Sequence, residues 1–265
     1  MSALTQYTVD AVHTPGLSEV VASLPLSLTR AGEEPAQLAT ITGARGWADR
    51  ALEAFDGGAL AAVVSSPSAD EGVPALPADI ATRAIIEWAF ACNPGVLVAA
   101  EAAAPLRERA VFADVELRLP TGADPDTALL DTLTAASRVL GPLTPVRSLH
   151  RDKASWHLSG SLTEDAPTAP VAIAIIVTDA APARLRLRLL TLDGGLTAVV
   201  PAPDTAAPAE VRIVGPDGER LLPTLWETSR RSAWRRAVAI AAGELVSADV
   251  AELYRVAALV PAHQG

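Results

Sequence analysis

Apolar and polar positions follow two different patterns along this chain, and the pattern changes after Pro105. Before that point, short apolar runs alternate with stretches of helical spacing. Strands are predicted at residues 7–12, 36–42, 59–66 and 96–100, and helices at residues 17–24, 47–55 and 78–92. The run at residues 59–66 is apolar and bounded by turn residues, which is typical of a fully buried parallel strand. This alternation of strands and helices predicts a parallel sheet with right-handed crossovers.

Residues after Pro105 alternate apolar and polar side chains instead. The segment 111–119 alternates in this way and the segment 184–188 does so strictly, which predicts strands of a sheet with one solvated face. Further strands are predicted at residues 144–150, 154–162, 171–179, 197–200, 210–215 and 220–222, and helices at residues 126–140 and 232–259. The predicted fold class is therefore α/β, with a parallel α/β unit followed by an α+β domain that has a mainly antiparallel open sheet.

Composition and charge narrow the range of partners. Asp and Glu outnumber Lys and Arg by 31 to 21, which gives a formal net charge of −10. Such a surface repels duplex nucleic acid and anionic membranes on average, so neither is expected as a partner. No apolar stretch is long enough to span a bilayer, and residues 1–10 lack the features of a signal peptide, so we expect a cytoplasmic protein. The single cysteine, Cys92, is interpreted as a buried core residue.

Five stretches carry a resemblance to a known family. They are the strand that ends in Ser66-Pro67, the segment that leads to Glu101, the helix that ends in Leu140-Gly141, the strand–turn–strand segment around Asp193-Gly194, and the closing helices at residues 233–258. In this order they resemble the glucose–fructose oxidoreductase/inositol dehydrogenase (Gfo/Idh/MocA) family, of which the chain looks like a shortened, divergent relative. The resemblance implies a degenerate Rossmann-like nucleotide-binding domain over residues 1–108. It implies an α+β sheet domain for substrate and subunit contacts over residues 109–265.

The resemblance also implies NAD or NADP as cofactor. The family's glycine-rich turn falls on residues 13–16, which keep one glycine and include Pro15, a residue without an N–H. Ordinary pyrophosphate binding through backbone amides is therefore not expected. The candidate cofactor contacts are His13 and Gly16 in this turn, Arg45 after the second strand, where it would favour a 2′-phosphate, and Ser66 and Pro67 in the family's Thr-Pro loop.

Candidate catalytic residues follow from the same resemblance and from one local cluster. The family's Glu-Lys-Pro motif falls on Glu101, but its lysine position is Ala102, which cannot donate a proton. Asp131 lies near the family's catalytic histidine position. It would act as a base if desolvated, and is otherwise an ordinary helix-surface aspartate. A cluster from residue 150 to residue 157 adds Lys153, the only lysine of the chain, and His157.

No metal is expected. His150 and His157 are seven residues apart, and on one continuous strand they would point to opposite faces, which argues against a shared zinc site. H-E-x-x-H and C-x-x-C patterns are also absent from the sequence. The alternative interpretation of this cluster is a polar strand-and-turn surface.

Two main functions remain open. The family also has a paired Asp and His on the later helix, and this chain lacks the two as a set. The missing glycines, the missing lysine and the missing pair predict a catalytically altered or non-catalytic homologue. It would form a homo-oligomer or bind a catalytic protein partner, through the open sheet or through the basic patch of Arg230, Arg231, Arg235 and Arg236. The alternative is an active NAD(P)-dependent oxidoreductase on a sugar, polyol or imine-like substrate. A weaker third option is a binder of a small sugar-like ligand without turnover.

Overall fold

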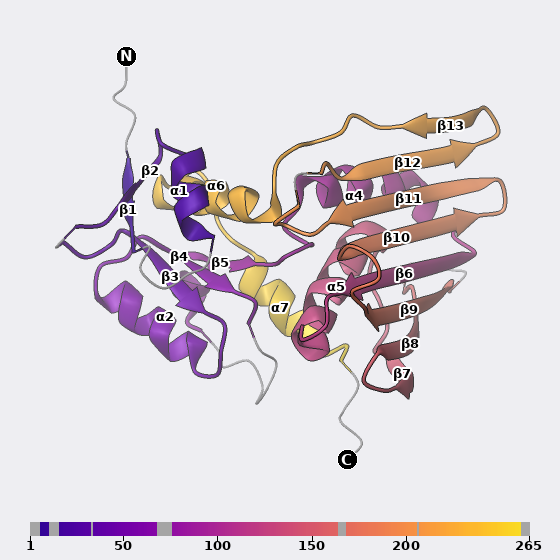
Figure 1. The fold of residues 1–265 in the computed structure, drawn as a ribbon, viewed down its shortest axis with the longest axis horizontal. Helices are drawn as coiled ribbons and strands as arrows, with labels where there is room; N and C mark the ends of the chain where they lie inside the picture. Colours follow the sequence, from indigo (N-terminus) through magenta and orange to yellow (C-terminus); the bar gives the residue numbers. More distant parts are fainter. Residues whose placement is uncertain are drawn as a thin grey trace. The chain divides into compact units, whose positions relative to one another are not determined.

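The computed structural model describes residues 6–10, 16–32, 34–67, 76–163, 168–205 and 207–260. The chain divides into two compact units (Figure 1). The parallel-sheet unit comprises Met1–Trp88 and Arg230–Tyr254, and the large-sheet unit comprises Ala89–Ser229 and Arg255–Gly265. This division differs from the expected single boundary at residue 108, because the chain leaves the first unit after Trp88 and returns to it at Arg230.

Five parallel strands form the sheet of the first unit, in the order β2-β1-β3-β4-β5. The strands are β1 (Tyr7–Val9), β2 (Leu28–Arg30), β3 (Leu38–Thr42), β4 (Ala61–Ser65) and β5 (Ala84–Glu87). The helices are α1 (Leu17–Ser23), α2 (Trp47–Asp56), α3 (Ala78–Ala81), nearly all of α6 (Ser229–Ala241) and most of α7 (Asp249–Ala257). The predicted parallel α/β unit is confirmed.

The strand order reverses beside β1. The chain passes from β1 through α1 to β2 on one side, whereas the next strand in sequence, β3, lies on the other side of β1. The strands β4 and β5 then continue outward from β3. In open parallel sheets, ligands bind outside the carboxyl ends of the strands at such a reversal. The carboxyl ends of β1 and β3 therefore mark the place where a binding site is expected.

The core of this unit agrees with the sequence pattern. The run Ala61–Val64 in β4 is at most 2% exposed, as expected for a strand covered on both faces. Trp47, Ala51 and Phe55 are buried along one face of α2, as their helical spacing predicted. Gly57 ends this helix.

One stretch of the sequence prediction is wrong. Residues 78–92 are not a helix and residues 96–100 are not a strand; instead α3 is short, β5 follows it, and α4 (Pro94–Arg107) is helical. Because Ala84–Glu87 is buried throughout, its apolar run has no alternation that would separate a strand from a buried helix. Asn93 starts a helix rather than ending one: its side chain accepts a hydrogen bond from Gly95 N at 2.8 Å, and Pro94 occupies the first turn.

Asp249, at the start of α7, covers the free edge of β5. Its carboxylate accepts a hydrogen bond from Ile86 N at 3.1 Å and is paired with Arg236 at 2.6 Å. Asp249 is only 3% exposed. An edge strand whose N–H groups are occupied in this way is less open to pairing with another chain. The C-terminal helices are thereby fastened to the parallel sheet.

Eight strands form the sheet of the second unit, in the order β13-β12-β11-β10-β6-β9-β8-β7. All neighbours are antiparallel except β6 and β9. The strands are β6 (Phe112–Leu119), β7 (Arg147–Arg151), β8 (Ser155–Ser161), β9 (Pro170–Val177), β10 (Arg184–Thr191), β11 (Gly194–Pro201), β12 (Glu210–Gly215) and β13 (Gly218–Leu221). The helices α4 and α5 (Pro125–Leu140) pack against each other and against this sheet (Figure 1). The predicted, mainly antiparallel sheet is confirmed.

The alternating pattern of β6 and β10 gives this sheet one buried face and one open face. Leu187 in β10 is 0% exposed, whereas its neighbours Arg186 and Arg188 point to the other side. There Arg186 is paired with Glu116 at 2.7 Å and Arg188 with Asp114 at 2.6 Å. Cross-strand pairs of opposite charge stabilise neighbouring strands by roughly 0.2–1 kcal/mol each. We call this side, which faces away from α4 and α5, the open face.

Candidate functional site at the carboxyl edge of the parallel sheet

The carboxyl ends of β1, β3, β4 and β5 meet at one edge of the parallel sheet, because the strands run in the same direction. The segments that follow these strands place four of the predicted cofactor contacts at this edge: Gly16, Arg45, Ser66 and Pro67. The fifth, His13, lies outside the described residues. The structure therefore gathers these four positions, and their role in cofactor binding remains a prediction.

The loops at this edge are joined by backbone hydrogen bonds. Gly43 N donates to Ser65 O at 2.8 Å, and Ser66 N donates to Glu87 O at 3.2 Å. A side-chain carbon on Gly43 would collide with Ser65 O and with the backbone of Pro67. Ser66 has a φ of 45°, and no other non-glycine residue of the described chain has a positive φ. Left-handed backbone at a non-glycine residue stores strain and is enriched at functional positions.

Arg50 covers the turn between β3 and α2. Its guanidinium donates to the carbonyl oxygens of Thr42, Ala44 and Arg45 at 2.9, 2.8 and 2.9 Å. These carbonyls are satisfied by a cation on α2, so the turn is held in one conformation. The exposed side chain of Arg45 consequently projects from a fixed backbone.

Arg230, at the start of α6, crosses the same edge. Its Nε lies 2.8 Å from Oε1 of Glu87, the last residue of β5, which is 7% exposed. The guanidinium also lies so close to Gly16 that a side-chain carbon on Gly16 would collide with Nη1 and Cζ of Arg230. Gly16 has a φ of 75°, a backbone conformation that favours glycine, and a side-chain carbon there would force the Arg230 guanidinium to shift. One arginine thus links the beginning of α1 to the end of β5.

This edge offers guanidinium groups instead of a glycine cradle. In nucleotide sites of this topology, backbone amides of a glycine-rich turn approach the pyrophosphate. Here the space beside Gly16 is filled by Arg230, and the space beside Gly43 is filled by the backbone of Ser65 and Pro67. Guanidinium groups bind phosphate oxygens in a bidentate geometry. Among the described residues of this edge, arginine side chains therefore fit a nucleotide phosphate, whereas the backbone beside Gly16 and Gly43 is already covered.

The position of the family's Glu-Lys-Pro motif needs correction. Because β5 and not residues 96–100 is the last parallel strand, the position after the strand falls on Glu87-Trp88-Ala89. Glu101 lies within α4 and is exposed. Trp88 is 1% exposed, and an indole can donate only a neutral N–H hydrogen bond. A lysine is therefore absent at the corrected position as well.

The four candidate catalytic residues all belong to the large-sheet unit and are not gathered there. Glu101 is on the exposed side of α4, Asp131 is buried in α5, Lys153 lies in the turn between β7 and β8, and His157 is exposed on β8. Within the described ranges, no hydrogen bond or ion pair joins any two of them. Contacts among these residues would have supported an active oxidoreductase; the described residues show none, and their catalytic roles stay predictions.

Asp131 is buried. The alternative in which it is an ordinary aspartate on the helix surface is therefore wrong. Asp131 is 4% exposed, and its carboxylate accepts hydrogen bonds from Phe90 N at 2.9 Å and Ala91 N at 2.8 Å. Burial raises the pKa of Asp131 to about 6, although the two backbone N–H groups and the nearby Arg138 favour the ionised form. Arg138 donates to Ala91 O at 2.7 Å. Together these contacts fasten the segment after β5 to α5.

His150 and His157 lie side by side, contrary to the expectation of opposite faces. They occupy paired positions on the antiparallel strands β7 and β8, and their ring centroids are 6.1 Å apart. The expectation failed because a turn separates the two histidines, so they are not on one continuous strand. His150 Nε2 lies 3.0 Å from Asp152 Oδ2, and this contact lowers the pKa of Asp152. Among the described residues, no group of three or more His, Cys, Asp or Glu side chains has the geometry of a metal site.

The predicted basic patch is partly neutralised. Arg230 is paired with Glu87, and Arg236 is paired with Asp249 at 2.6 Å. These two arginines hold the parallel-sheet unit together and do not form a free cationic surface. The pairing of Glu87 with Arg230 was not predicted from the sequence. The sequence signal for it was a glutamate directly after three apolar residues, Ala84, Ile85 and Ile86, at what is now seen to be a strand end.

No helix in the described portion is long and apolar enough to cross a membrane.

No family of known sequences matches the chain, and no curated protein matches it. Solved structures do match. KijD10, a 3-ketoreductase from Actinomadura kijaniata in complex with NADP, aligns with a TM-score of 0.62 and 14% identity, over 96% of this chain and 87% of that one. The UDP-N-acetylglucosamine 3-dehydrogenase GnnA from Acidithiobacillus ferrooxidans aligns with a TM-score of 0.58 and 13% identity, over 94% and 92%.

KijD10 has also been solved with both NADP and TDP-benzene, and that structure aligns with a TM-score of 0.60 and 12% identity, over 96% of this chain and 87% of that one. At these identities the likeness concerns the fold. The resemblance to Gfo/Idh/MocA-type oxidoreductases that the sequence suggested is confirmed at that level.

Proposed function

We propose that this chain is an NAD(P)-dependent oxidoreductase of a sugar, polyol or imine-like substrate, with its nucleotide site at the carboxyl edge of the parallel sheet. The observation that carries the proposal is that the segments of Gly16, Arg45 and Ser66 follow strands that end beside the strand-order reversal, with Arg230 against Gly16 and Glu87. The fold shared with a 3-ketoreductase in complex with NADP supports it. A nicotinamide cofactor, when bound, supplies hydride transfer.

The residues of this chain would hold the nucleotide by its charge. The Arg230 guanidinium stands beside Gly16, where a pyrophosphate would approach the start of α1, and Arg45 projects from the end of β3. In this topology, an arginine at the end of the second strand accommodates a 2′-phosphate, and the residue that ends β2 is the exposed Arg30, whereas Arg45 follows the third strand. We therefore propose NADP as the preferred form. Ser66, exposed and strained at the end of β4, would contact the same ligand.

Proton transfer needs an acid–base group in addition to the arginines of this edge. Glu87 is the carboxylate that the structure places at the strand end, and it is engaged by Arg230. The other proposed acid–base residues are Glu101, Asp131, Lys153 and His157. No hydrogen bond or ion pair between described residues joins any two of them. We therefore assign binding and orientation to the edge of the parallel sheet, and assign general acid–base chemistry to no single residue.

The test is transfer of deuterium from [4-²H]NADPH to a panel of nucleotide-linked keto sugars, polyol-derived ketones and cyclic imines, followed by mass spectrometry. The proposal predicts label in at least one product, dependent on the protein. A loss of transfer in Arg230→Gln at low NADPH that is restored at high NADPH would place the defect in cofactor binding. An absence of label with every substrate class would reject the proposal.

A second function has its own supporting observation. Trp88 occupies the corrected lysine position and is almost fully buried, which removes the group that the family uses beside the transferred hydride. A catalytically altered homologue that acts through association, with itself or with a catalytic partner, is consistent with that loss. The open face, with charged rows of both signs, is the proposed contact surface. Sedimentation velocity of the purified chain tests self-association, and a monomer at all concentrations would remove the homo-oligomer form of this proposal.

A further inference from the structure

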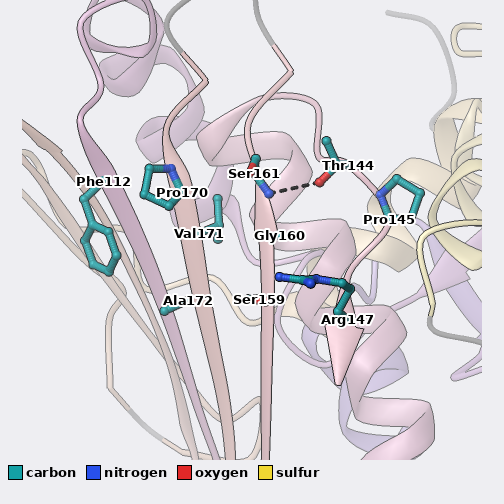
Figure 2. A pocket seen from close by; sticks show the side chains of 10 residues that line it. All are labelled: Phe112, Thr144, Pro145, Arg147, Ser159, Gly160, Ser161, Pro170, Val171 and Ala172. Atoms are coloured by element: carbon teal, nitrogen blue, oxygen red, sulfur yellow. Dashed lines mark hydrogen bonds between the residues drawn. The ribbon is translucent and has the colours of Figure 1, made fainter. Parts of the chain in front are cut away.

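A hollow of about 380 Å³ lies on the open face of the large sheet, at the end where β9 begins and β8 finishes. Figure 2 shows Phe112 and Pro170 along one side of it and Arg147 along the other. Ligand cavities in proteins measure roughly 300–1,000 Å³, so this hollow suits a small molecule. It belongs entirely to the large-sheet unit and is independent of the nucleotide site proposed above.

Three side chains cross the hollow in one row. Arg147 in β7 pairs with Ser159 in β8, and Ser159 pairs with Ala172 in β9. Directly opposed residues of antiparallel strands point to the same face. In Figure 2 the side chain of Arg147 extends back over β8 toward Ser159. Ala172 is too small to fill the end of this row, which leaves space beside the serine.

The polar groups of this row lack partners in the described part of the chain. The Oγ atom of Ser159 is buried and has no hydrogen-bond partner there. Arg147 is exposed and, within the same ranges, has no ion pair or side-chain hydrogen bond. Buried polar atoms in folded proteins are nearly always hydrogen-bonded, so an unsatisfied hydroxyl at a cavity wall indicates a missing acceptor or donor. An anion beside Arg147 supplies an acceptor for both groups.

The opposite wall is apolar and the rim is fixed. Phe112, Pro170 and Val171 form the apolar side. Thr144 is held on the rim because its N–H donates to Ser161 O at 2.9 Å and its Oγ1 accepts from Ser161 N at 3.0 Å. The hollow thus combines one guanidinium, an unsatisfied hydroxyl and an apolar wall, which is the composition of a site for an amphiphilic anion.

The surrounding charges permit an anion here. Asp114, the acidic neighbour of Ala172 across β6 and β9, is paired with Arg188 at 2.6 Å. Its negative charge is therefore compensated locally, and Arg147 is the one charged side chain among the described residues that line the hollow. We propose that this hollow is a binding site for a small carboxylate with an apolar body, in which the carboxylate meets Arg147 and Ser159 and the body lies against Phe112 and Pro170.

The experiment is calorimetric titration of the full chain with benzoate, acetate and benzyl alcohol. Benzoate carries both features, acetate lacks the apolar body, and benzyl alcohol lacks the charge. The proposal predicts that benzoate binds at least tenfold more tightly than either of the others, since charge-assisted hydrogen bonds and apolar burial contribute separately. Amide chemical shifts on adding benzoate should change first in residues 144–147 and 159–161. Equal weak binding of all three, or shifts spread over the surface, would overturn it.

Two variants locate the site. Arg147→Gln should weaken benzoate binding about tenfold or more, and Ser159→Ala should weaken it several-fold without loss of folding. Arg220 on β13 provides a matched control, because it is an exposed arginine on the opposite edge strand of the same sheet. Arg220→Gln should leave benzoate affinity unchanged. An equal effect of Arg147→Gln and Arg220→Gln would show that benzoate responds only to net charge and would reject the site.

Discussion

The guanidinium of Arg230 fills the space beside the α-carbon of Gly16 while it is paired with the nearly buried carboxylate of Glu87. Gly16 and Arg230 are 214 positions apart in the sequence, so their contact fastens α6, near the C-terminus, to the beginning of α1. It also places a guanidinium, whose charge Glu87 balances, at the strand-order reversal, where a parallel sheet binds its ligand. The attachment of α6 to α1 and the proposed nucleotide binding therefore depend on the same arginine.

Gly16→Ala should destabilise the protein through two effects. A side chain at φ 75° costs about 1–2 kcal/mol, and its Cβ would displace Arg230 from Glu87. Displacement leaves a nearly buried carboxylate without its partner, so we expect a total loss of about 2–4 kcal/mol in the free energy of unfolding. Urea unfolding monitored by tryptophan fluorescence measures it.

Gly243→Ala is the matched control for that measurement. Gly243 has a φ of 74°, but a side-chain carbon there meets no atom within 4 Å. It should therefore show only the backbone cost of about 1–2 kcal/mol. Equal destabilisation by the two substitutions would mean that the contact between Arg230 and Gly16 contributes nothing to stability.

Asp249→Ala should be among the most damaging single substitutions in the parallel-sheet unit. It removes the acceptor for Ile86 N and leaves Arg236 without its buried partner, and we expect a loss of about 3 kcal/mol or more. Asp249→Asn keeps an oxygen for Ile86 N and should lose less. Thermal unfolding of both variants is the measurement, and a smaller loss in the alanine variant than in the asparagine variant would contradict the edge-covering role.

Asp131 should make stability depend on pH between about 4 and 6. Its pKa is about 6 in the folded chain against 3.8 for an ordinary aspartate, so the folded state holds the proton more tightly. The stabilisation is complete below pH 4 and is lost as pH rises through 6, by an amount on the order of 2–3 kcal/mol. Asp131→Asn removes the titration, and the difference in unfolding free energy between wild type and variant should fall over this window. A constant difference from pH 4 to pH 7 would show that Asp131 does not titrate there.

Much of the fold could be predicted from the sequence because its strongest signals are local. The alternation in residues 184–188 identified a half-open strand, and the fully apolar run before Ser66 identified a buried one. The failure at residues 78–100 had a physical cause. Ala84–Glu87 is covered on every side, so side-chain periodicity carries no information, and Asn93-Pro94 has the residue types of both a helix start and a chain break.

The candidate site was harder to predict, because its main contacts join distant parts of the chain. The positions Gly16, Arg45 and Ser66 could be found from the strand ends that precede them. The pairing of Arg230 with Glu87 could not, since both belong to segments whose neighbours depend on the fold. Asp131 illustrates the same limit: helical spacing shows which face it occupies, but only the packed segment at residues 89–91 shows that this face is buried.

The most direct test of the central claim is calorimetric titration with NADPH and NADH of the wild type, Arg230→Gln and Arg235→Gln. Arg235 is an exposed arginine on the same helix and controls for the change in charge. Thermal unfolding first confirms that each variant is folded at the titration temperature. The account predicts NADPH binding at micromolar concentration, about tenfold or more weaker binding by Arg230→Gln, and little change in Arg235→Gln. No binding of either nucleotide at millimolar concentration, or equal binding by all three proteins, would contradict it.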